Sequence, residues 1–138
     1  MFIKFRSHLT HGRVPGTRER GSVTLENIII YPAVMIFIFG FFQFALWLHA
    51  KDLAHGAATA AYYESRVLNG TAAQGQAAGQ NLIDGAGGTI NGSTVTVTRT
   101  ATTIVATVTG STTMMIPGWP GSSLSETVTG PIERFVAP

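Results

Sequence analysis

Glu26 is the residue of this chain whose position most clearly asks for a chemical explanation. It lies at the start of a long apolar run, from Ile28 to Leu48, and follows Gly21 by five residues. A carboxylate in the hydrocarbon of a bilayer is unfavourable by roughly 2.5 to 3.5 kcal/mol at the centre, and by less near the edge. If the chain were cut between Gly21 and Ser22, the new amino terminus would lie one helical turn from Glu26. The spacing therefore points to a charge pair that forms after proteolysis.

The rest of the chain offers little for catalysis or metal binding. Charged residues make up 12% of the sequence, and there is no cysteine, so thiolate metal ligands and disulfides are excluded. His49 and His55 do not share a helical face well, which disfavours a metal pair. The glycines at 85–88 lack the Lys-Ser/Thr of a phosphate-binding loop. We expect no catalytic residues, no metal, no cofactor and no enzymatic activity; an envelope enzyme is the least favoured class.

The basic residues are concentrated before the apolar run. Of the 9 basic residues in the chain, the ones in this leader are Lys4, Arg6, Arg13, Arg18 and Arg20. Because positively charged flanks stay in the cytoplasm, residues 1–21 are predicted to form a basic cytoplasmic leader, with the carboxyl-terminal part extracytoplasmic. The leader carries no nucleic-acid-binding motif, so we expect no nucleic-acid partner.

The apolar run is long enough to cross a membrane. Its length of about 21 residues corresponds to a helix of roughly 31 Å, against a hydrocarbon core of about 30 Å. A cleavable secretory signal has a shorter apolar core of about 7 to 15 residues. We therefore expect a retained signal anchor, with a transmembrane part at about 27–48 inside a helix over 22–68. Ser22 is expected to cap this helix, and Pro32 to kink it.

The long helix is predicted to continue beyond the membrane, because apolar residues recur there at helical spacing. The predicted stripe contains Leu46, Ala50, Leu53, Ala57, Ala61 and Leu68. Its alanines would let a partner helix approach closely. The pair Asn69-Gly70 is expected to end the helix in a left-handed cap. A short helix over 71–83 and a glycine-rich linker then complete the segment 69–88; one side of this helix would carry Gly75, Ala78, Gly79 and Leu82.

Beyond residue 88 the sequence alternates with a period of two, as a strand does. Residues 93–99 alternate valine with threonine, and residues 103–109 place Ile104, Ala106 and Val108 on one face. A hairpin and a third strand at 124–129 would form a small extracytoplasmic β domain over 89–138, covered by the long helix. The predicted fold class is α+β, with a partly transmembrane N-terminal helix packed on an antiparallel sheet of about three strands. An apolar loop with Met114, Met115 and Trp119 predicts either a partner contact or core packing.

Several of these features occur together in one known family. The segment Arg20-Gly-Ser-Val-Thr-Leu-Glu26, the proline at 32, the pair Gln43-Phe44 and the closing segment 130–135 resemble the TadE-like family of tight-adherence, type IV pilin-like pilus proteins. The resemblance implies that a prepilin peptidase cuts after Gly21 and leaves Ser22 first. It also implies that Glu26 pairs with the amino terminus of a neighbouring subunit. Asn27 stands where many such prepilins have an aromatic residue, which leaves open whether the chain is cut.

The resemblance implies a non-enzymatic minor pilin or pseudopilin that aids pilus biogenesis, surface attachment and secretion by a tight-adherence system. Such a protein crosses the inner membrane once. Its implied partners are the prepilin peptidase, the pilus assembly platform, the major pilin and paralogous minor pilins. Whether it enters the fibre or stays at its base is left open. The alternative that the residues allow is a single-pass, signal-anchored binding module of the envelope.

Overall fold

A computed structural model describes residues 18–115 and 121–134 of the chain, with side chains from residue 26 onward. Two helices come first, α1 (Arg18–Arg66) and α2 (Ala72–Gly85). Three strands follow, β1 (Ile90–Arg99), β2 (Thr103–Thr112) and β3 (Ser123–Pro131). The predicted α+β class with a long N-terminal helix is confirmed. The chain divides between Ile36 and Phe37 into two compact units.

The first unit contains the start of α1. The helix begins at Arg18, so Ser22 lies inside it, and the prediction that Ser22 caps the helix is wrong. Arginine and glutamate are good helix formers, and the segment Arg18-Glu19-Arg20 therefore extends the helix upstream of the expected cap. The helix continues across Pro32, where the proline ring removes one backbone donor. The kink expected there stays a prediction.

The second unit begins with the rest of α1, which ends at Arg66. Asn69 has a left-handed backbone, with φ of 67°, and the Gly70 amide donates to the Val67 carbonyl at 2.9 Å. Asparagine and glycine tolerate this conformation, so the predicted left-handed turn is confirmed. The turn begins earlier than expected, however. Leu68 therefore lies outside the helix and is 68% exposed, so its assignment to the buried stripe is wrong.

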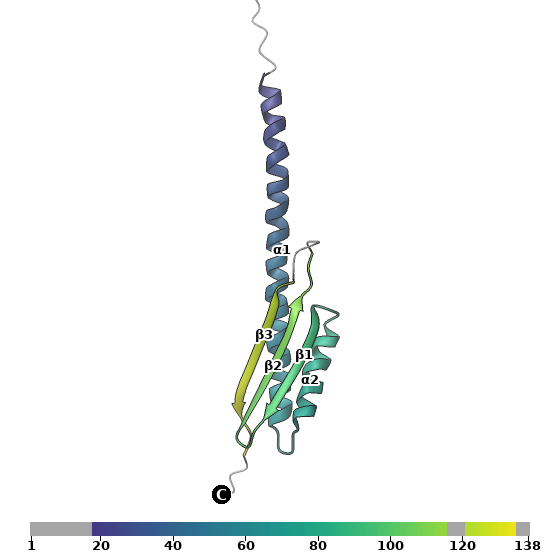
Figure 1. Ribbon diagram of the computed structural model, residues 1–138, viewed down its shortest axis with the longest axis vertical. Helices are drawn as coiled ribbons and strands as arrows, with labels where there is room; N and C mark the ends of the chain where they lie inside the picture. Colours follow the sequence, from purple (N-terminus) through teal and green to yellow (C-terminus); the bar gives the residue numbers. More distant parts are fainter. Residues whose placement is uncertain (1–17, 116–120, 135–138) are drawn as a thin grey trace, which may run out of the picture. The chain divides into compact units, whose positions relative to one another are not determined.

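The three strands form one antiparallel sheet in the order β1-β2-β3 (Figure 1). The predicted hairpin turns at residues 100–102, where the Thr100 amide donates to the Thr103 carbonyl at 2.9 Å. Val97 faces Ala106 across this pair, and Ala106 faces Val128 of β3. The register of β1 shifts between Asn91 and Thr94, next to Gly92 at φ 59°. A glycine suits such a bulge because it adopts positive φ without a steric penalty.

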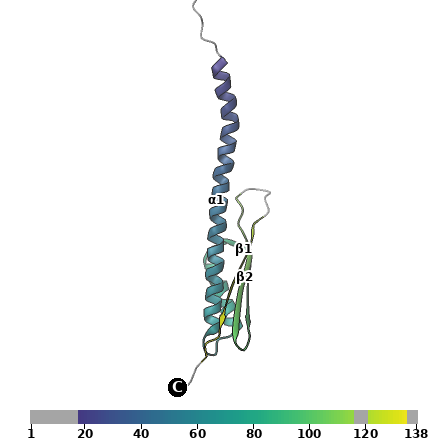
Figure 2. The ribbon, with the colours of Figure 1, turned by 90° about the vertical axis from the view of Figure 1, so that its left-hand side faces the viewer.

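Within the second unit, α1 and α2 lie against the same face of the sheet (Figures 1 and 2). The sheet supplies branched side chains to this core, and Ile104, Ala106 and Val108 of β2 are fully buried. The helix supplies small ones at helical spacing, namely Ala50, Ala54, Ala57, Ala58 and Ala61, all fully buried. The prediction that the long helix covers the apolar face of the sheet is therefore confirmed.

Glycines on α2 bring that helix close to α1. A Cβ atom at Gly75 would overlap Ser65 Oγ and lie 2.5 Å from the Ala61 carbonyl oxygen. A Cβ atom at Gly79 would lie 3.0 Å from the Ala57 carbonyl oxygen. The buried side of α2 consists of Gly75, Gly79 and Ile83. Leu82 had been predicted on this side but is 38% exposed, because the helix turns Ile83 inward instead.

Candidate functional site

The residues of the predicted processing segment all lie on α1. Gly21, Ser22 and Glu26 fall in its helical backbone, and the Glu26 side chain is exposed. Positions four residues apart share one face of a helix, so Ser22 and Glu26 lie on the same side, about 6 Å apart along the axis. Pro32, also exposed, follows further along the same helix. The helical repeat therefore places Ser22 and Glu26 on one face, whereas Gly21, five residues before Glu26, does not share that face.

The surface of α1 after Glu26 is covered with large apolar side chains. The most apolar window of 18 residues in this helix has a mean hydropathy of 2.2 and no buried residue. Ile36, for example, is 73% exposed and Phe37 is 77% exposed. Water disfavours such a surface strongly, whereas lipid acyl chains accept it. The helix therefore indicates that the protein is anchored in a membrane by a single pass.

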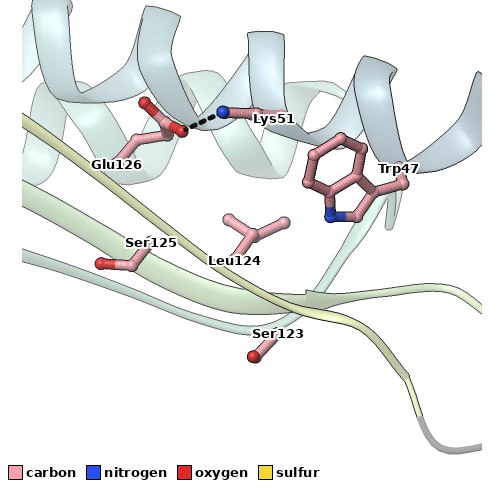
Figure 3. A pocket seen from close by; sticks show the side chains of 6 residues that line it. All are labelled: Trp47, Lys51, Ser123, Leu124, Ser125 and Glu126. Carbon is pink, nitrogen blue, oxygen red and sulfur yellow. Dashed lines mark ion pairs between the residues drawn. The ribbon is translucent and has the colours of Figure 1, made fainter.

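Where the apolar run ends, α1 and β3 enclose a small open cleft of about 210 Å³ (Figure 3). Trp47 and Lys51 line it from α1, with the Lys51 ammonium 5.5 Å from the centre of the indole ring. Leu124 and Glu126 point into it from β3. Lys51 Nζ lies 3.5 Å from Glu126 Oε1. The cleft therefore presents an aromatic face beside one cation and one anion.

Glu126 also contacts a second side chain of α1. His55 Nδ1 lies 3.7 Å from Glu126 Oε2, and the Glu126 side chain is only 19% exposed. Lys51 and His55 lie four residues apart on one helical face, which lets both reach the same carboxylate. Within residues 18–115 and 121–134, no group of three or more His, Cys, Asp or Glu side chains is placed to hold a metal ion. Two side chains of α1 thus converge on one carboxylate of β3.

The apolar loop after β2 meets α1 through a glutamine. Gln43 Nε2 donates to the Thr113 carbonyl at 3.4 Å, and Gln43 Oε1 accepts from the Met115 amide at 3.2 Å. Met114 is half-buried and Met115 is 50% exposed. Trp119, the third predicted contact residue of this loop, lies outside the described residues. This contact between the loop and Gln43 was not predicted from the sequence. The one feature that could have suggested it is the polar side chain of Gln43 inside an apolar run.

The closing segment of the chain is tied to the end of α1. The Tyr62 hydroxyl donates to the Pro131 carbonyl at 3.1 Å. A Cβ atom at Gly130 would overlap the Tyr62 ring, so any larger residue there would displace the tyrosine from its present position. Arg66 Nη2 then lies 3.2 Å from Glu133 Oε1. The segment resembling the family's carboxyl-terminal end thus fixes the last strand against the helix.

Comparison with known proteins supports the resemblance found in the sequence. The family described as TadE-like protein matches residues 21–62. The match begins at Gly21, covers the apolar run and extends into the buried alanine stripe of α1. The resemblance to TadE-like, pilus-associated proteins is therefore confirmed over this segment. No curated protein and no solved structure matches the chain.

Proposed function

We propose that this chain is a minor pilin or pseudopilin of a tight-adherence pilus machine. The observation that carries the proposal is the match of the TadE-like family from residue 21 onward, on a helix that exposes large apolar side chains between Ile28 and Leu48. A retained helix of this kind anchors a subunit before assembly and packs against other subunits afterwards. The head, which consists of the end of α1 from residue 49 onward, α2 and the three strands, would then lie outside the cytoplasm, with the basic leader inside.

Glu26 is the residue that would connect processing to assembly. Cutting between Gly21 and Ser22 would create an ammonium group one helical turn from the Glu26 carboxylate. In the low dielectric near the bilayer, an unpaired carboxylate is unfavourable, and a nearby cation offsets part of that penalty. A neighbouring subunit's amino terminus can supply this cation and thereby set the axial register between subunits.

The helical state of the cutting site affects how a peptidase would act on it. Residues 18–22 are helical, and a peptidase that binds an extended strand would have to unwind them. Gly21 makes this easier, since a glycine in a helix is less favourable than alanine by about 1 kcal/mol. Glycine would thus serve both the close approach of the peptidase and the local opening of the helix.

The amino terminus of the mature protein tests this proposal directly. Mass spectrometry of protein from cells that contain a prepilin peptidase should give a terminal peptide beginning at Ser22. Gly21→Arg should block cutting while membrane insertion persists, since the apolar run is untouched. An intact leader on protein from normally piliated cells would contradict the processing step.

The role of Glu26 is separable from processing. Glu26→Ala should leave the protein inserted and cut but impair pilus assembly, because the amino terminus loses its partner. Glu26→Asp keeps the charge on a shorter side chain and should retain part of the activity. Counting pili by electron microscopy gives the measurement. Normal piliation with Glu26→Ala would contradict the pairing role.

A second function, a signal-anchored binding module of the envelope, is favoured by the cleft between α1 and β3. An indole face beside Lys51 and Glu126 could bind a zwitterionic or sugar-like group. This function requires neither cutting at Gly21 nor Glu26. It would be supported if Trp47→Ala abolished attachment of cells to a surface while the number of pili stayed normal.

A further inference from the structure

Gln43 lies inside the apolar run, yet both the NH₂ group and the carbonyl oxygen of its side chain form hydrogen bonds. The NH₂ group donates to the carbonyl of Thr113, and the carbonyl accepts from the amide of Met115. The backbone of residues 113–115 is thereby held against α1 at the level of Gln43. These residues all belong to the second compact unit, residues 37–138.

This contact lies within the apolar run, before its end at Leu48. Gln43 precedes Leu48 by five residues, which is about 7.5 Å along a helix. Elements that lie in the membrane interface insert about 5 to 10 Å into the boundary between headgroups and acyl chains. At this level α1 exposes Phe42 by 53% and Phe44 by 56%, and Met115 is 50% exposed. An irregular backbone segment therefore lies beside a helix surface suited to lipid.

Irregular backbone is tolerated at such a depth only when its polar groups have partners within the protein. Glutamine carries both a donor and an acceptor, so a single side chain satisfies the Thr113 carbonyl and the Met115 amide. The Thr113 hydroxyl is also engaged, since it donates to the Gly88 carbonyl at 3.0 Å. It further accepts from Asn91 Nδ2 at 3.2 Å. The Thr113 carbonyl, the Thr113 hydroxyl and the Met115 amide thus have partners within the protein, while the Met115 side chain stays exposed.

We propose that residues 113–115 form a second membrane contact of the head, inserted beside α1 into the leaflet on the head's side. Lipid covers the exposed side chain of Met115, because this side chain adjoins the part of α1 around Gln43, where neighbouring apolar side chains are exposed. The head would therefore be held at the bilayer at two points and at a fixed height. Gln43 acts as the positioning residue, since its amide ties the connection to the helix.

Site-directed spin labelling of the full chain tests this proposal. The chain has no cysteine, so Met115→Cys gives a single labelling site. The labelled protein would be placed in nanodiscs at one copy per disc, and relaxation by oxygen compared with relaxation by a water-soluble nickel chelate. Phe42→Cys serves as the lipid-exposed reference. Thr127→Cys, on the exposed face of the sheet, serves as the aqueous reference.

The expected result is that the label at position 115 responds like the one at position 42, with oxygen more effective than the nickel chelate. A response like that at position 127 would overturn the proposal. A label that neither reagent reaches would also overturn it, because protein rather than lipid would then cover the site.

The variant Gln43→Leu tests whether the hydrogen bonds of Gln43 determine the depth of residue 115 in the membrane. Adding this change to the labelled Met115→Cys protein removes both hydrogen bonds and should shift the label toward the aqueous response. Phe41→Leu, which leaves the amide in place, is the matched control and should not shift it. Circular dichroism would verify that the head remains folded. An unchanged depth in a folded Gln43→Leu protein would overturn the positioning role.

Discussion

The two parts of α1 on either side of residue 49 are built from different side chains, although one helix contains both. Before it, large apolar residues such as Ile36 and Phe41 are more than half exposed. After it, small residues such as Ala54, Ala58 and Ser65 are fully buried. The first region exposes apolar side chains all around the helix, whereas the second buries an apolar stripe whose side chains are small. The two regions therefore differ in the size of their apolar side chains as well as in hydropathy.

Size is informative because the two regions face different surroundings. Lipid chains fill the space around bulky side chains, so large exposed residues suit a membrane-spanning helix. Close contact with a neighbouring helix requires small side chains, because backbones must approach one another. Ser65 fits the second region despite its hydroxyl, which donates to the Ala61 carbonyl at 2.7 Å and so leaves no unpaired polar group. A single helix can thus serve as an anchor at one end and as a core element at the other.

The largest expected effect comes from a charge at the centre of the first region. Phe37→Asp should impair membrane insertion, because an aspartate at mid-bilayer is unfavourable by roughly 2.5 to 3.5 kcal/mol. The fraction of protein that resists alkaline extraction from membranes measures this. Tyr63→Asp makes the same change at an exposed position of the second region and should not alter insertion. Equal insertion of both variants would contradict the division of the helix into two surroundings.

The sequence predicted those parts of the structure that repeat locally. The strand alternation around Ile104 and the helical spacing of Ala50, Ala57 and Ala61 were both correct, because each depends on side chains a few residues apart. The errors lay at the two ends of α1: Ser22 lies inside the helix rather than at its start, and Leu68 lies beyond its end. Boundaries depend on small differences in free energy that a sequence pattern does not resolve.

Contacts between distant segments could not be predicted in the same way. Gln43 and Met115 are 72 residues apart in the chain, so no periodicity connects them. The cleft at Trp47 likewise depends on the register of β3 against α1. The match of Gly75 and Gly79 to the alanines of α1 leaves only a weak signal in the sequence, namely glycines that lower the helix propensity of a short helix. The predicted processing site, in contrast, rests on residues within two helical turns of one another, so a sequence pattern can propose it; it stays a prediction.

An intermediate effect should follow from adding one methyl group to the tight contact in the second region. Gly75→Ala should destabilise the head by about 1 to 3 kcal/mol, because the added Cβ overlaps Ser65 and the backbone of α1. Gly56→Ala is the matched control, since nothing lies within 4 Å of a Cβ atom there. It should stabilise the helix by up to about 1 kcal/mol. Urea unfolding in detergent gives both values, and stabilisation by Gly75→Ala would contradict the close packing of α2.

The smallest expected effect concerns the Lys51–Glu126 ion pair, which lies where the two regions of α1 meet. Glu126→Gln removes the carboxylate that faces Lys51 and His55 but keeps the shape of the side chain. Because Lys51 is 47% exposed, water and salt screen the interaction, and the loss should stay within about 1 kcal/mol. A double-mutant cycle with Lys51→Met, followed by urea unfolding at low and high salt, isolates this coupling. A coupling that is small and falls with salt would show that the second region depends on its packed alanines rather than on its charges. A large coupling that salt leaves unchanged would show that the ion pair contributes more to stability than the packed alanines do. The charge at the junction of the two regions would then be more important to the second region than the size of its side chains.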